Sequence, residues 1–313
     1  MSEAAESFES YYEREIAPGL ETREAERRNA VRAWAIAVAI GLGLAALIFT
    51  WGGGFGGGGW SFILAFMAAI GGLAVGQSFL GAVAGDAKTL LLGKVAAFAG
   101  VSFVWRVEDP SAIHAFRQLR LVPAYDRSKF EDFIAGERAG APFELFEAHL
   151  ERRHADSKGR TRHSTAFRGQ LIRALVPMRF QGVTVVLRDA GLMNALIKPD
   201  GRLERVGLVD PKFEKIFEVF GSDQVEARYL LTPDFMERLL KLETLLKGKK
   251  ARAAFAEGAL LIAVEGGDLF EAGSMFTPLD DPARARRVLG EIRTIEAIID
   301  ALMARPFPPP TVH

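Results

Sequence analysis

The apolar and polar positions divide the chain into an uncharged run near the N-terminus and a longer part in which charged and apolar side chains are mixed. From Ala33 to Gly85 there is no Asp, Glu, Lys, Arg or His. A charge at the centre of a bilayer costs about 2.5–3.5 kcal/mol on insertion scales, so long uncharged apolar runs are typical of membrane-spanning helices. The glycine-rich stretch Trp51–Trp60 interrupts the run, because glycine is a poor helix former. The pattern predicts a transmembrane helical hairpin with spans at 33–50 and 61–85, each long enough for a hydrocarbon core of ~30 Å.

Residues 1–32, before the spans, form a charged segment. Phe8, Tyr12 and Ile16 recur every four residues, which predicts an amphipathic helix that ends near Pro18. The pattern leaves open whether this helix lies on the membrane surface or packs on the globular domain, and the scarcity of Lys and Arg favours packing on the domain. A signal peptide has a short basic region before a short apolar one. Here a long charged segment precedes a long apolar run, so no cleavage is expected.

Small residues at four-residue spacing form a ladder in each span. The ladders are Ala33, Ala37, Gly41 and Ala45 in the first span, and Ala68, Gly72 and Gly76 in the second. Lipid supplies no hydrophobic drive for helix association, so close backbone contact through small residues holds such helices together. Because Gln77 is the most polar side chain in the spans, a transport path is not expected.

Helices and strands both occur after the spans. Asp-Pro or Thr-Pro pairs suit helix starts, since the first residue caps the helix and Pro fits its first turn. They predict helices at 110–121, 211–220, 233–247 and 282–304, and a further short helix is expected at 128–135. Strands are predicted at 101–107, 143–151, 165–176 and 183–188, with a hairpin of 251–256 and 259–264.

Helices that cluster, rather than alternate with strands, indicate the α+β class with a mainly antiparallel sheet. The predicted organisation after the spans is a membrane-proximal connector at 86–107, an α+β domain at 108–305 and a proline-rich tail at 306–313.

Charge and cysteine content narrow the function. The chain has 39 basic and 39 acidic residues and no cysteine, so we expect no nucleic-acid partner, no disulfide and no thiolate chemistry. Basic residues flank the hairpin, whereas its tip is uncharged: Arg23, Arg27, Arg28 and Arg32 lie before it, and Lys88 and Lys94 follow it. Because positive flanks stay in the cytoplasm, we expect both termini to be cytoplasmic.

The candidate chemical site is the row Glu147, His149 and Glu151. On a strand these side chains share one face, where they could bind a divalent metal and serve a membrane-anchored hydrolase. In the competing interpretation the face is solvated, and Arg168 and Arg173 pair with the carboxylates. The glycine-rich stretches lack the strand–helix setting of a nucleotide loop, and no triad, Walker or kinase pattern occurs. No nucleotide or cofactor is therefore expected, and metal binding is left open.

Several motifs resemble one uncharacterised bacterial membrane-protein family, the domain of unknown function numbered 3137. They are Gly207–Glu214, Phe217–Arg228 and Leu231–Phe235, together with Phe167–Gln170, Phe180–Val186 and Phe270–Ser274. The resemblance covers nearly the whole chain. It implies an N-terminal helical segment, two spans and a cytoplasmic α+β domain at the bacterial inner membrane. It implies no catalytic residues.

Two hypotheses follow. The first is a non-enzymatic interaction or scaffold domain, tethered to the lipid bilayer, that binds an unknown protein partner; the alternative is the metal-dependent hydrolase. Candidate partner-binding residues are Asp223, Gln224, Glu226 and Arg228, in a polar stretch expected to connect a helix ending at Gly221 to one capped by Thr232. The same side chains could instead brace the two helices through free backbone groups.

Overall fold

The computed structural model describes residues 7–52, 59–138, 140–155, 160–176, 180–188, 203–245, 250–267, 270 and 273–303. The chain forms two compact units. The helical unit comprises Met1–Phe98 and Glu271–Leu289, and the sheet unit comprises Ala99–Phe270 and Gly290–His313. The predicted proline-rich tail and most of the glycine-rich tip lie outside the described residues.

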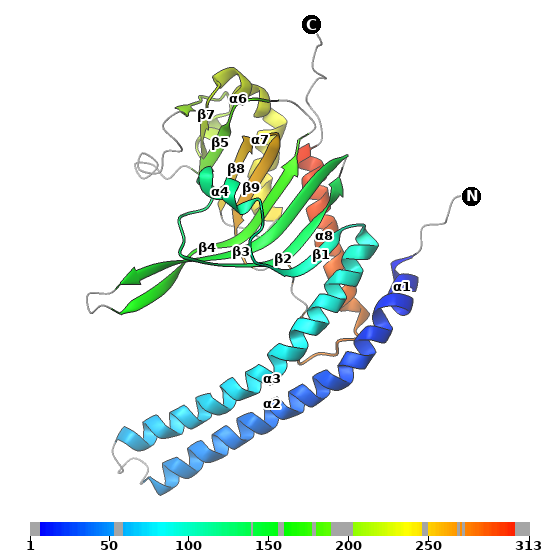
Figure 1. Cartoon of the computed structure of the whole chain (residues 1–313), viewed down its shortest axis with the longest axis vertical. Coiled ribbons are helices and arrows are strands. Elements are labelled where there is room, and N and C mark those ends of the chain that lie inside the picture. Colours follow the sequence, from blue (N-terminus) through cyan, green and yellow to red (C-terminus); the bar gives the residue numbers. More distant parts are fainter. Residues whose placement is uncertain are drawn as a thin grey trace. The chain divides into compact units, whose positions relative to one another are not determined.

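Two long helices dominate the helical unit (Figure 1). A short helix α1 (Phe8–Tyr11) and a π-helical turn η1 (Tyr12–Ile16) lead into α2 (Ala17–Trp51), and α3 spans Gly59–Ala99. The helix does not end near Pro18 as predicted, because this proline lies in the first turn of α2, where it costs no hydrogen bond. Both long helices continue well beyond the uncharged run.

Each long helix carries a segment long and apolar enough to cross a membrane. The most apolar windows have mean hydropathies of 2.2 and 1.9, and only 6% and 11% of these windows are buried. Ile36, Leu44 and Phe66, for example, are more than half exposed. A core helix of a soluble protein would be mostly buried, so the two helices do not have that character.

The N-terminal elements α1 and η1 pack against the C-terminal end of α3. The ring of Phe98 lies 5.1 Å from that of Phe8 and 5.0 Å from that of Tyr11, and the Tyr11 hydroxyl donates to the Lys94 carbonyl at 3.2 Å. Lys94 also pairs with Glu15 at 3.0 Å. Contacts with α3 therefore hold the N-terminal helix within the helical unit.

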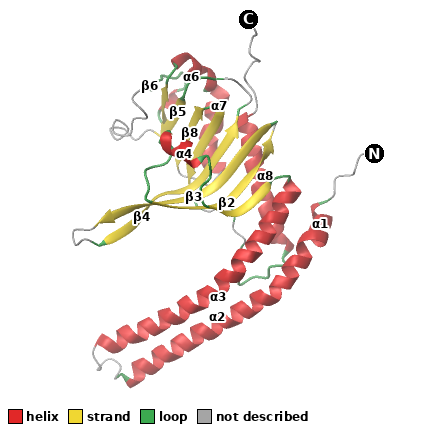
Figure 2. Ribbon diagram, in the orientation of Figure 1, coloured by secondary structure: helices red, strands yellow, loops and turns green. Residues whose placement is uncertain are grey.

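In the described part of the sheet unit, nine strands form one sheet in the order β1-β2-β3-β4-β9-β8-β5-β7-β6, and every neighbouring pair is antiparallel (Figure 2). The strands are β1 (Ser102–Val107), β2 (Arg127–Arg138), β3 (Ala141–Ala155), β4 (Thr161–Leu175), β5 (Thr184–Arg188), β6 (Glu204–Arg205), β7 (Phe217–Gly221), β8 (Lys250–Ala256) and β9 (Ala259–Glu265). The helices are α4 (Ile113–Gln118), α5 (Pro211–Glu214), α6 (Gln224–Leu230), α7 (Pro233–Leu245) and α8 (Pro282–Met303), the last of which begins in the helical unit. The α+β class and the mainly antiparallel sheet are confirmed.

Three local predictions were wrong. Residues 128–135 belong to β2 because β1 and β3 pair with both edges of this segment. The helix from Pro211 stops at Glu214, and Phe217–Gly221 pairs between β5 and β6. The helix expected at 110–121 is confined to Ile113–Gln118. In the first two cases strand pairing overrides the local helix signal.

An aromatic cluster fills the core between α4 and the sheet. Phe146 of β3 lies edge-to-face against Phe116 of α4 at 6.3 Å and against Phe130 of β2 at 5.8 Å. Phe146, Ala148 and Leu150 all point into this cluster, so the alternate residues of β3 point to the opposite face.

Candidate functional site

The row Glu147, His149 and Glu151 lies on one face of β3, as predicted. All three side chains are half-buried and alternate with the buried Ala148 and Leu150. The His149 ring nitrogen Nε2 lies 3.0 Å from the Thr165 hydroxyl on β4.

Charged side chains of both signs, from the neighbouring strands, surround this row. Lys129 and Arg168 flank His149 in the register of β2 and β4, and Glu131 is the partner of Glu147 on β2. Lys129 lies 2.5 Å from Glu131. Burial raises the pKa of Glu131, but hydrogen bonds from Lys129 and Arg106 outweigh it and lower the pKa overall.

These side chains border a hollow of about 60 Å³, which has both acidic and basic walls. Among the residues that the structure describes, no group of three His, Asp or Glu side chains is placed to share a metal ion. This face carries ion pairs, but not all of the predicted ones: Arg173 pairs with Glu144, outside the row, at 3.4 Å, and Arg127 of β2 lies 3.8 Å from Glu151. The described residues offer the hydrolase alternative no ligand set.

The segment Asp223–Arg228 forms most of helix α6, so it is not the helix-to-helix connector that the sequence predicted. Asp223 caps α6 by accepting from Val225 N at 2.7 Å and Glu226 N at 3.0 Å. Glu226 accepts from Gln181 N at 2.8 Å and Gly182 N at 2.7 Å.

The other two candidates of this segment also bond to neighbouring chain. Arg228 donates to the Gly207 carbonyl at 3.2 Å and to Gln224 at 3.2 Å, and Gln224 donates to Glu204 at 3.4 Å. The four side chains therefore brace the segments around α6, although Asp223, Gln224 and Arg228 remain exposed.

Sequence reasoning missed a buried charged cluster that joins α2 to residues 273–281, here called the strap. The Glu24 carboxylate accepts from Arg27 Nε and Nη2, both at 2.7 Å, and from the Leu279 amide at 2.9 Å. Arg27 Nη1 donates to the Met275 carbonyl at 2.8 Å. Spacings of three and four residues hinted at pairs of Glu24 with Arg27 and Arg28, but no local signal identifies a partner 255 residues away.

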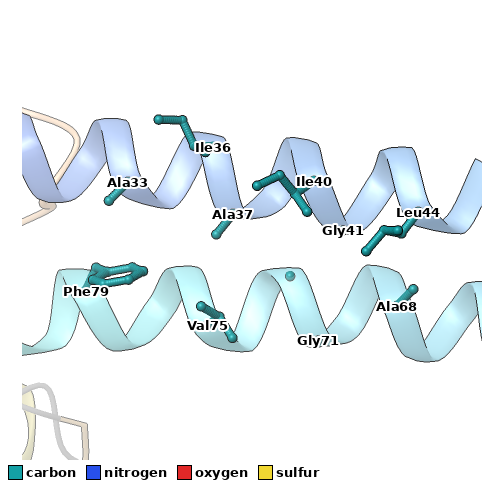
Figure 3. A pocket seen from close by; sticks show the side chains of 11 residues that line it. Ala33, Ile36, Ala37, Ile40, Gly41, Leu44, Ala68, Gly71, Val75 and Phe79 are labelled. Carbon is teal, nitrogen blue, oxygen red and sulfur yellow. The ribbon is translucent and has the colours of Figure 1, made fainter.

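The two spans approach each other through their small residues. A Cβ atom added to Gly72 would lie 2.7 Å from the Ala37 carbonyl and 2.8 Å from Gly41 Cα, whereas one added to Gly71 would meet nothing within 4 Å. An apolar groove of about 600 Å³ runs beside this contact (Figure 3). It is lined by Ala33, Ile36, Ala37, Ile40, Gly41, Leu44, Ala68, Gly71, Gly72, Val75 and Phe79.

A two-stranded projection, here called the basic arm, extends β3 and β4 beyond their neighbours (Figure 1). It comprises residues 152–155 and 160–165, all of them exposed. Pairing of β2 with β3 ends at Glu151, and pairing of β4 with β9 begins at Gly169. The arm carries Arg152, Arg153, Arg160 and Arg162, and its described residues include no Asp or Glu.

Comparison with known proteins supports the family resemblance. Residues 165–303 match the family model described as "Protein of unknown function (DUF3137)", the family that the sequence motifs resemble. The match begins after the spans and is therefore shorter than the resemblance seen in the sequence. A similar solved structure is the mycobacterial trehalose monomycolate transport factor A, TtfA, with 12% identity and a TM-score of 0.34; the similarity covers 72% of this chain and 98% of that one. No curated protein matches.

Proposed function

We propose that this protein is a membrane-anchored adaptor without enzymatic activity. Helices α2 and α3 cross the bacterial inner membrane, both termini and the sheet unit lie in the cytoplasm, and the basic arm binds an acidic, extended segment of a partner protein. The observation that carries the proposal is the arm itself, since it gathers four exposed arginines on a two-stranded projection whose described residues include no Asp or Glu, a composition that attracts negative charge.

The membrane anchoring is supported by the exposed apolar surface of both helices and by the positions of the basic residues. The uncharged run begins directly after Arg32, and Lys88 follows it on α3. Two basic flanks and an uncharged tip favour cytoplasmic termini.

Both faces of the basic arm are positive. Arg153 pairs in register with His163, and His154 pairs with Arg162, so arginine side chains point to opposite faces of the ribbon. The described arm has no apolar side chain larger than that of Ala155, and it includes no Phe, Tyr or Trp on which a nucleic-acid base could stack. Its chemistry therefore favours electrostatic recognition of an acidic partner.

The outer edge of β4 favours a protein over a lipid surface as that partner. In the described sheet, no strand pairs with β4 on this edge before Gly169. An extended peptide can add to such an edge through backbone hydrogen bonds, which lipid headgroups cannot form in the same pattern. The arginines repel a second copy of the arm and attract an acidic strand.

The test uses the full-length protein in nanodiscs of neutral lipid and two labelled probes, an alternating Glu–Val peptide and its Lys–Val counterpart. We expect fluorescence anisotropy to report salt-sensitive binding of the acidic probe only. Reversal of two arm charges, Arg152→Glu with Arg162→Glu, should weaken binding about tenfold, since each exposed charge pair contributes up to about 1 kcal/mol and two pairs are lost.

The matched control reverses two exposed charges away from the arm, Arg205→Glu with Lys212→Glu, and should bind as the wild type does. Equal loss in both double variants would contradict the role of the arm. Binding of the wild type to anionic vesicles but not to the acidic peptide would make the partner a membrane and overturn the proposal.

A further inference from the structure

We infer that the strap rests on the lipid headgroups of the cytoplasmic leaflet, with the ring of Phe276 in the interfacial layer. The inference rests on the proposed membrane anchoring. It adds a third membrane contact, from a segment far along the chain, to those of the two spans.

Contacts within the helical unit fix the strap on α2. Arg27 holds the Met275 carbonyl, Glu24 holds the Leu279 amide, and the Tyr12 hydroxyl donates to the Asp280 carbonyl at 2.7 Å. These bonds lie on both sides of Phe276, so the position of its backbone along α2 is set by protein alone.

That position is the boundary between the polar and apolar parts of α2. The ring of Phe276 lies edge-to-face on Trp34, with centroids 5.1 Å apart. Trp34 is the second residue of the uncharged run, and Arg32 is the last charge before it. At ~1.5 Å per residue, Arg28 lies roughly 9 Å from Trp34 along the helix axis, toward the N-terminus, which places it at the level of the lipid headgroups when Trp34 lies at the interface. Aromatic side chains concentrate at this level of a membrane protein.

The loop presents Phe276 instead of burying it. The residue is 54% exposed, so contact with an apolar layer would remove much of its ring from water. Arg284 anchors the loop by donating hydrogen bonds to the carbonyls of Ser274 and Thr277. Gly273 has a φ of +83°, a conformation that favours glycine, and its missing side chain leaves room for the Arg284 guanidinium. These hydrogen bonds hold the loop in a conformation that exposes an aromatic ring. Such a ring can insert into the interfacial layer of the bilayer.

Single-cysteine labelling in the full-length protein tests this, because the native chain has no cysteine. A bimane label at Met275→Cys reports on the strap, one at Leu44→Cys on the centre of a span, and one at Val209→Cys on exposed protein, since Val209 is 93% exposed. Each is reconstituted in phosphatidylcholine vesicles and quenched with headgroup-level spin-labelled lipid, mid-chain spin-labelled lipid or aqueous iodide.

We expect the strap label to be quenched most by the headgroup-level lipid, the span label by the mid-chain lipid and the control label by iodide alone. Phe276→Ser should reduce lipid quenching of the strap label at least twofold, whereas Phe276→Trp should preserve it. If the span label is quenched by lipid and the strap label is not, the inference is overturned while the anchoring stands. If the span label itself escapes lipid quenching, the anchoring fails first. A strap label shielded from both lipid and iodide would mean that protein covers Phe276, which also overturns the inference.

Discussion

Replacing Glu24 with Gln is expected to release the strap from α2. The carboxylate is the acceptor for three separate donors, namely Arg27, Arg28 and the Leu279 amide. Its side chain is only 4% exposed. A glutamine keeps one acceptor oxygen and places an amide N–H group against a guanidinium, so the buried Arg27 loses its counter-charge. Arg28 also loses a partner, but its side chain is largely exposed.

The pKa of Glu24 gives the size of the effect. Hydrogen bonding to Arg27, with help from Leu279 and Arg28, outweighs burial and lowers the pKa from an ordinary 4.5 to about 2. At 1.36 kcal/mol per pKa unit, the ionised carboxylate contributes about 3 kcal/mol to the whole cluster. Arg27 and Arg28 lie on α2 with Glu24, so the part of this contribution that acts directly on the strap is the hydrogen bond to the Leu279 amide. Because the pKa is lowered on folding, this contribution is fully present above pH 4.5 and is lost as the pH falls towards 2.

Hydrogen–deuterium exchange of the full-length protein in detergent measures this opening. Peptides covering 273–281 should exchange about tenfold faster or more in Glu24→Gln at neutral pH, since the Leu279 amide loses a charged acceptor and such a hydrogen bond contributes about 1.5–3 kcal/mol. Glu26→Gln, two residues away and exposed, removes the same charge and should leave exchange unchanged. Equal exchange in Glu24→Gln and the wild type would refute the reasoning, as would an equal effect of Glu26→Gln.

Two further predictions concern the spans and α6. Gly72→Leu should loosen the hairpin and increase its protease sensitivity in membranes, because a Cβ there meets the Ala37 carbonyl. Gly71→Leu adds the same side chain into open space and should not increase the sensitivity; equal sensitivity of the two variants would show that the close contact is incidental. Asp223→Ala should destabilise α6 by about 1 kcal/mol through loss of its cap, and the melting temperature of the full-length protein should fall. Asp234→Ala removes an exposed ion pair and should have less than half that effect; similar melting of both variants would contradict the capping role.

Local sequence determined those features whose cause lies within a few residues. The caps at Asp210, Thr232 and Asp281 start their helices as predicted, since a cap and a following proline act on the adjacent turn. The tight turn Glu257-Gly258 joins β8 and β9 with positive φ at both residues. The uncharged run likewise predicted the two long helices, because the amino-acid composition of a helix decides whether it can face lipid.

Tertiary structure decided the features that depend on distant partners. Residues 128–135 form a strand because two other strands bond to their edges, an effect that outweighs their helical pattern. Glu24 and Arg27 are spaced like an ordinary surface pair on a charged helix, yet the strap buries them. The basic arm emerges only because β2 and β9 pair with β3 and β4 along part of their length. Local propensity acts between residues near in sequence, whereas burial and strand pairing depend on which remote segments the fold brings into contact.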